Sequence, residues 1–123
     1  FKVEGEEYEL SSIVSVTLYR IIQEACNNAI RHSKAKRIYV KLSFKDNFIV
    51  IDVEDNGIGF DIYKVEQRSK EDFLHGFGLS TMRERAKLLS GTFSIDTKPE
   101  CGTRIHVSVP VKTTSRKEEK SYE

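Results

Sequence analysis

The amino-acid sequence predicts an α+β fold, a two-layer α/β sandwich in which a mixed or antiparallel sheet is covered by helices on one face. Apolar side chains recur at helical spacing in two segments and at every second position in others. The expected elements follow the order strand, helix, strand, strand, loop, helix, strand, strand, so that consecutive strands are joined by hairpins. A chain of 123 residues has the length of one domain with one core.

The first half of the chain predicts a long helix between strands. A short strand signal in the first ten residues precedes a helix that we expect to run from Ser11 or Ser12, both plausible N-cap residues, to about His32. Its apolar stripe consists of Leu18, Ile21, Ile22, Ala25 and Ala29. Strands are expected over residues 37–44 and 48–54, and the polar residues 45–47 between them suit a hairpin turn.

The second half predicts a loop, a shorter helix and a final hairpin. Residues 61–75 are polar and without a clear period, which indicates a mobile loop. A helix is expected over 79–89, with Gly91 as its C-terminal stop, followed by strands over 92–97 and 103–111. Because residues 112–123 are nearly all polar, we expect a folded domain over 1–111 and a disordered tail.

The composition argues against several classes of protein. Lys and Arg number 20 and Asp and Glu 19, and this net charge of +1 is unlike the basic excess of proteins that coat nucleic acid. No apolar run approaches the roughly 20 residues that span a bilayer. The two cysteines, Cys26 and Cys101, indicate neither a disulfide framework nor a zinc site, and we expect free thiols. Since the sequence starts at Phe1 and not at Met, we expect it to be a piece of a longer protein.

Polar residues along one edge of the long helix are candidates for chemistry. Glu24 and Asn28 lie one turn apart on the same face, and Arg31 and His32 follow one turn further on. A carboxylate can orient a nucleophile, an amide oxygen can ligate Mg²⁺, and a guanidinium can pair with phosphate. On spacing alone, the better-supported alternative is an amphipathic helix whose polar edge is solvated and has no chemical role.

Glycine-containing segments are the second candidate feature. Asp55-Asn56-Gly57-Ile58-Gly59 follows an apolar strand, where the Asp could accept a hydrogen bond from an exocyclic amine such as that of adenine. Gly76-Phe77-Gly78-Leu79 opens a helix whose free N–H groups could meet a phosphate. Gly102-Thr103 is a weaker signal, and ordinary turns or a hinge would explain all of these segments. The spacing fits neither a Walker loop nor a dinucleotide-binding fold.

In this order, the motifs resemble those of the GHKL superfamily, the Bergerat-fold ATP-binding domain shared by gyrase, Hsp90, histidine kinases and MutL. Residues 23–32 look like its N-box, 55–61 like its G1 box and 76–79 like its G2 box, and the likeness extends from about Leu18 to Pro110. The run 78–86 is similar to one branch of bacterial sensor histidine kinases, the branch that includes the nitrate sensors.

The resemblance implies a set of nucleotide-binding residues, namely Asn28, Arg31, His32, Asp55, Gly57, Gly59, Gly76, Gly78, Leu79 and Thr103. Within this set, Asp55 is expected to bind the adenine amine and Asn28 the Mg²⁺ ion between the phosphates. Glu24 matches the carboxylate that acts as a base in the hydrolysing relatives, and in a kinase it would assist transfer to a histidine.

The same resemblance implies the catalytic domain of an ATP-dependent protein-histidine kinase, cytoplasmic and monomeric as a fragment. The γ-phosphate of ATP would pass to a histidine on a dimerisation and phosphoacceptor domain absent from this chain, and then to an aspartate of a response regulator. None of His32, His75 and His106 is a sensible acceptor, so the fragment is not expected to phosphorylate itself.

Alternative functions stay open at this point. Within the fold, they are a serine kinase of the anti-sigma type and an ATPase like gyrase, Hsp90 or MutL. From a different class, the basic segment 31–37 could be a non-enzymatic binding patch for nucleic acid or a membrane surface. A single basic run without interleaved aromatic residues is a poor nucleic-acid site, so we expect no nucleic-acid partner.

Overall fold

The computed structural model describes residues 1–59 and 78–112, which form a mixed sheet and two helices. In chain order the elements are β1 (Lys2–Glu4), α1 (Ser12–Arg31), β2 (Ile38–Phe44), β3 (Phe48–Asp55), α4 (Leu79–Leu88), β4 (Thr92–Thr97) and β5 (Thr103–Pro110). Their bounds lie within a residue or two of the predicted ones. The predicted loop over 61–75, Gly76 and the tail beyond residue 112 lie outside the described residues.

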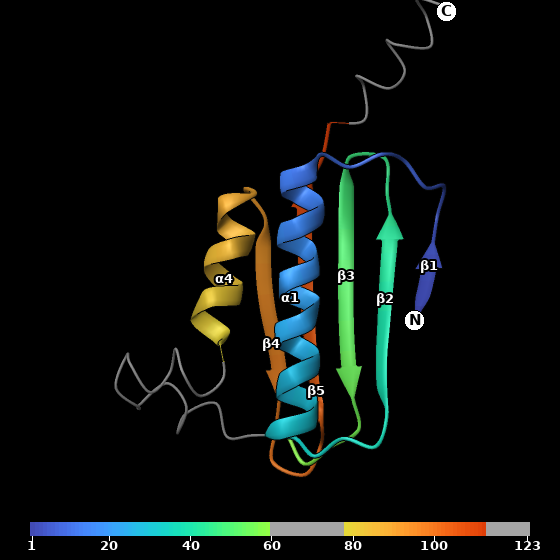
Figure 1. The fold of residues 1–123 in the computed structure, drawn as a ribbon. Helices are drawn as coiled ribbons and strands as arrows, with labels where there is room; N and C mark the ends of the chain where they lie inside the picture. The colour runs from blue at the N-terminus through green and yellow to red at the C-terminus, as the bar shows by residue number, and fades with distance from the viewer. Residues whose placement is uncertain (60–77, 113–123) are drawn as a thin grey trace, which may run out of the picture.

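The described strands form one five-stranded sheet in the order β1-β2-β3-β5-β4. β1 pairs with β2 in parallel, whereas the β2–β3, β3–β5 and β4–β5 pairs are antiparallel. Both helices lie over the same face of this sheet, α1 in front of the central strands and α4 beside it near β4 (Figure 1). The predicted α+β sandwich with a mixed sheet is therefore confirmed.

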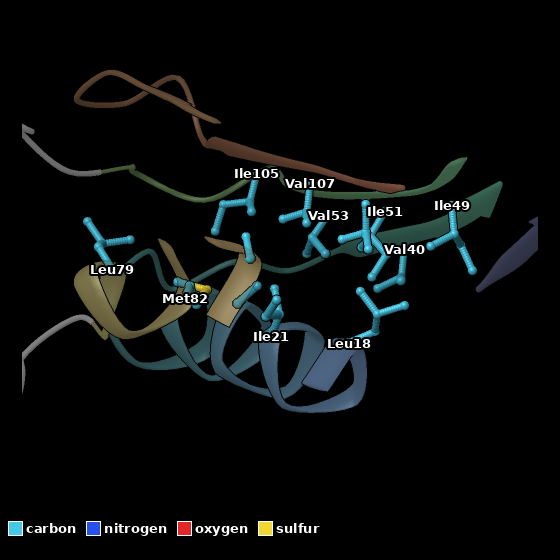
Figure 2. Close-up of a cluster of buried hydrophobic side chains, with 13 residues drawn as sticks. Leu18, Ile21, Val40, Ile49, Ile51, Val53, Leu79, Met82, Ile105 and Val107 are labelled. Atoms are coloured by element: carbon cyan, nitrogen blue, oxygen red, sulfur yellow. The ribbon is translucent and has the colours of Figure 1, made fainter. Parts of the chain in front are cut away.

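The core lies between the sheet and the helices. Every second residue of β3 and β5 points to the helices, because side chains alternate along a strand. The resulting buried residues of the two strands are Ile49, Ile51, Val53, Ile105, Val107 and Val109. Figure 2 shows side chains from these strands opposite Leu18 and Ile21 of α1 and Met82 of α4. The 3.6-residue period predicted the apolar stripe of α1, and the burial of this stripe fixes the orientation of α1 against the sheet.

The ends of the helices carry the expected local signals, with one correction. Ser11 is the N-cap of α1, and its Oγ accepts a hydrogen bond from the backbone N–H of Val14 at 3.3 Å. Gly91 was predicted as the C-terminal stop of the second helix, and the structure places the left-handed residue that ends it one position earlier. Ser90 takes the left-handed conformation, with φ of 59°, and Gly91 donates its N–H to the Ala86 carbonyl at 2.8 Å. Gly91 is a glycine because a Cβ there would meet Ser108 O at 2.5 Å.

In the part of the chain that the structure describes, neither helix is long and apolar enough to cross a bilayer.

Candidate functional site

The predicted site residues gather at one end of the sheet. α1 and β3 both run toward this end, and the turn between β4 and β5 lies there as well (Figure 1). Asp55 is the last residue of β3 and Thr103 the first of β5, and the two are directly paired in the antiparallel register. The topology thus brings segments that lie far apart in the sequence to the same end of the molecule.

Asp55 is held by a small hydrogen-bond network. Its Oδ1 accepts hydrogen bonds from Ser33 Oγ at 2.7 Å and from the Gly57 backbone N–H at 2.8 Å. The Ser33 hydroxyl in turn accepts the Gly59 N–H at 3.0 Å. Ser33 is only 1% exposed and follows the C-cap residue of α1. The network therefore ties the end of α1 to the end of β3 and to the loop that follows.

The bare backbone at the two loop glycines is used by the protein itself. A Cβ on Gly57 would collide with the backbone oxygen and the hydroxyl of Ser33. A Cβ on Gly59 would collide with Lys98 O and approach Gly102 O to 2.7 Å. At these two glycines, the space that a side chain would need is taken by Ser33 on one side and by the β4–β5 turn on the other.

Further side-chain hydrogen bonds, which the sequence did not predict, stabilise this end of the sheet. Asn56 Oδ1 accepts the backbone N–H groups of Lys36 and Arg37 at 3.0 and 2.8 Å, which fixes the approach to β2. The Thr103 hydroxyl lies 2.9 Å from that of Thr97, so its side-chain hydrogen-bond partner is on β4. Ser33 was not among the predicted site residues, because nothing in the sequence marks a serine as a partner of an aspartate 22 positions away.

The predicted residues of α1 differ in exposure. Asn28 is buried, 5% exposed, and its backbone carbonyl accepts the N–H groups of His32 and Ser33 at 2.9 and 3.1 Å. Arg31 ends the helix and is exposed, whereas the C-cap residue His32 is half-buried. Asn28 is thus linked through Ser33 to Asp55, while Arg31 is free to reach toward solvent.

Glu24 is a residue of α1 whose side chain contacts the start of α4. The half-buried Glu24 side chain packs on Gly78, where a Cβ would collide with its carboxylate. Gly78 is the N-cap of α4, with a left-handed φ of 62° and no side-chain capping bond. An anionic group beside a helix N-terminus is favourably placed with respect to the helix dipole. The next residue, Leu79, is 1% exposed and its side chain belongs to the core, so only its backbone could meet a ligand.

A hollow of about 350 Å³ opens beside Asp55. Its lining includes Glu54, Asp55, Asp96, Thr97, Thr103 and Arg104. None of the described residues that line it comes from α1 or α4. Asp55 and Thr103 both line this hollow, and Ser33 contacts Asp55 from the end of α1.

The fold and this arrangement agree with the family that the chain matches. Residues 13–113 match the family of histidine kinase-, DNA gyrase B- and HSP90-like ATPases, and the chain belongs to that family. Within it, the chain is an ATPase domain of the sensor histidine kinase type. The resemblance noted in the sequence is therefore confirmed.

Its relatives include larger signalling proteins. The chain is 38% identical over 108 residues to the signal transduction histidine-protein kinase/phosphatase DegS of Bacillus subtilis. This match covers 88% of this chain and 27% of DegS. It is 37% identical over 109 residues to the sensor protein VraS of Staphylococcus aureus, covering 88% of this chain and 29% of VraS. The chain thus spans less than a third of the length of these relatives.

Solved structures show the same fold. The ATP binding domain of PrrB from Mycobacterium tuberculosis matches with a TM-score of 0.61 and 26% identity, covering 80% of this chain and 69% of that one. The histidine kinase domain of the blue-light activated kinase EL346 from Erythrobacter litoralis matches with a TM-score of 0.65. This second match covers 89% of this chain and 53% of that one, and at 16% identity it shows the fold alone.

Proposed function

We propose that this chain binds ATP together with Mg²⁺ and supplies the γ-phosphate to a histidine of a dimerisation and phosphoacceptor domain of the same protein. The phosphoryl group would then pass to an aspartate of a cognate response regulator. The observation that carries the proposal is the held carboxylate of Asp55, next to a helix that offers Glu24, Asn28 and Arg31. In the reaction, a bond forms between a histidine ring nitrogen and the γ-phosphorus, the bond to the β–γ bridging oxygen breaks, and ADP leaves.

The residues of this chain would have distinct roles. Asp55 accepts a hydrogen bond from the adenine amino group. Arg31 and His32, at the end of α1, interact with the phosphates. The Gly78 end of α4 offers backbone N–H groups to the same negative charge. Glu24, which packs on Gly78, is placed to orient the attacking group.

The donor chemistry around Asn28 fits a hard divalent cation. Mg²⁺ prefers oxygen ligands and is commonly held by one or two protein oxygens together with phosphate oxygens. Asn28 has a carboxamide oxygen, is 5% exposed and lies one turn from the Glu24 carboxylate on the same helix. Asn28 would therefore hold the ion, which neutralises phosphate charge when bound.

The kinase reaction is favoured over the alternatives by the relatives, since DegS is named a histidine-protein kinase/phosphatase and VraS a sensor protein. A kinase domain that draws on ATP and passes phosphate to a regulator would act in the cytoplasm. The serine-kinase and gyrase-like readings have no observation of their own in the described residues.

A calorimetric titration of the chain with ATP, ADP and GTP, with and without Mg²⁺, tests the proposal. We expect binding that is selective for adenine and strengthened by Mg²⁺. Asp55→Ala should abolish that selectivity, whereas Asp46→Ala, in the hairpin at the opposite end of the sheet, should leave it unchanged. Equal affinity for ATP and GTP, or an Asp55→Ala variant that binds like the wild type, would contradict the proposed site.

A further inference from the structure

We infer that Ser33 is a specificity-determining positioning residue of the adenine site. It orients the Asp55 carboxylate so that one oxygen stays available to a ligand that carries an amino group. This inference rests on the proposed function and adds to it the residue that makes the site select a 6-amino over a 6-oxo purine.

The direction of the hydrogen bonds at Ser33 is determined by its partners. A backbone N–H can only donate, so the Ser33 hydroxyl must accept the bond from Gly59, at 3.0 Å. A hydroxyl has a single proton, and this proton is then left for Asp55 Oδ1, at 2.7 Å. The only proton of the buried hydroxyl is thus committed to Asp55, and the hydroxyl sets the carboxylate and the loop relative to each other.

The two oxygens of Asp55 are therefore not equivalent. Oδ1 accepts bonds from Ser33 and from the Gly57 N–H, at 2.7 and 2.8 Å. No residue within 1–59 or 78–112 donates a hydrogen bond to Oδ2. An ionised carboxylate oxygen can only accept, so it matches an exocyclic amine and repels a carbonyl oxygen. The geometry thus favours adenine over guanine or hypoxanthine at this position.

Ser33 also holds the loop through its backbone. Its carbonyl accepts the Ile58 N–H at 2.6 Å, and the absence of a side chain on Gly57 lets residues 57–59 wrap around Ser33. Loss of the hydroxyl would leave the Gly59 N–H without its acceptor and Asp55 without one donor. The carboxylate would then be free to rotate, and the recognition of the amine would weaken.

The test compares two ligands within each variant of the full 123-residue chain. ADP carries the 6-amino group, whereas purine riboside 5′-diphosphate carries hydrogen in its place and cannot bond to Asp55. In the wild type, we expect ADP to bind about tenfold more tightly or better, the value of a hydrogen bond to a charged group. Ser33→Ala should bring this ratio close to one, chiefly by weakening ADP binding. A general loss of stability would weaken both ligands alike and leave the ratio unchanged.

Ser43→Ala is the matched control, since Ser43 is a second buried serine, 3% exposed, and lies on β2 outside this network. It should keep the wild-type ratio. Should Ser33→Ala fail to fold, Ser33→Cys retains a similar size with a much weaker donor and should also lower the ratio.

The outcomes separate the inference from the proposed function. A wild-type chain that does not distinguish the two ligands would overturn both. A wild-type preference that is lost in Asp55→Ala but kept in the Ser33 variants would overturn only the role of Ser33, as would an equal loss of affinity for both ligands. A preference lost in the Asp55 and Ser33 variants and kept in Ser43→Ala supports the inference.

Discussion

Asp52 and His106 face each other across β3 and β5, with 2.6 Å between Asp52 Oδ1 and His106 Nδ1. They lie on the face of the sheet opposite the helices, because the neighbouring Ile51 and Val53 point to the core. Arg104 adds a contact of 3.3 Å to Asp52 and a second of 3.3 Å to Glu54. Burial by itself would raise the pKa of Asp52, but the hydrogen bonds and charges of His106 and Arg104 outweigh it and lower that pKa below 3.8.

This pairing predicts a contribution to acid stability. Because the pKa of Asp52 is lower in the folded than in the unfolded chain, the unfolded chain binds more protons between the two values. The contribution is therefore fully present above the ordinary pKa of 3.8 and is lost as the pH falls through the lower folded value. Asp52→Asn should flatten this part of the pH dependence, measured by urea unfolding from pH 6 to pH 2.5. Glu84→Gln, an exposed carboxylate on α4, should keep the wild-type slope.

Packing of the sheet against α1 predicts a large cost for core truncation. Ile51 is fully buried in the centre of β3, whereas Ile13 is 70% exposed in the first turn of α1. Ile51→Ala should lower the free energy of unfolding by about 2–5 kcal/mol through lost burial and the cavity left behind. Ile13→Ala should change it by no more than about 0.5 kcal/mol. Equal effects in denaturant unfolding would contradict the layer arrangement.

The contact between Glu24 and Gly78 predicts coupled substitutions. Gly78→Ala should destabilise the chain for two reasons: a side chain at φ of 62° costs about 1–3 kcal/mol, and its Cβ collides with the Glu24 carboxylate. Glu24→Ala removes only the second of these. In a double-mutant cycle, Gly78→Ala should therefore cost about 1 kcal/mol less in the Glu24→Ala background. Strictly additive changes in the free energy of unfolding would mean that the two side chains do not clash.

The proposed magnesium role predicts different behaviour for neighbouring asparagines. Asn28 is buried next to the Asp55 network, whereas Asn27 is exposed on the outer side of α1. Asn28→Ala should remove the strengthening of ATP binding by Mg²⁺ while leaving the protein folded. Asn27→Ala should bind ATP and Mg²⁺ like the wild type. Calorimetry in the presence and absence of Mg²⁺ measures both, and a Mg²⁺ effect that survives in Asn28→Ala would exclude the assigned ligand.

Much of the fold followed from local patterns. The 3.6-residue stripe of α1, the alternation in β2 and the polar turns each depend on residues close together in the sequence, and the elements lie within a residue or two of their predicted bounds. The reason for Gly91 at the end of α4 could not be read from the sequence, because a glycine serves equally a left-handed turn and a close approach. Only the position of Ser108 on β5 shows that the second reason applies.

The candidate site was predicted as a set of motifs and not as an arrangement. The motifs around Asn28, Asp55 and Gly78 were enough to suggest a nucleotide-binding family, because in this order they resemble the motifs of that family. What only the tertiary structure decided is which groups hold one another: Ser33 on Asp55, Asn56 on the approach to β2, Glu24 on Gly78. Such pairs depend on the end of α1, the end of β3 and the start of α4 meeting in space. The packing of the whole core brings these three ends together, and this packing cannot be predicted from any single segment of the sequence.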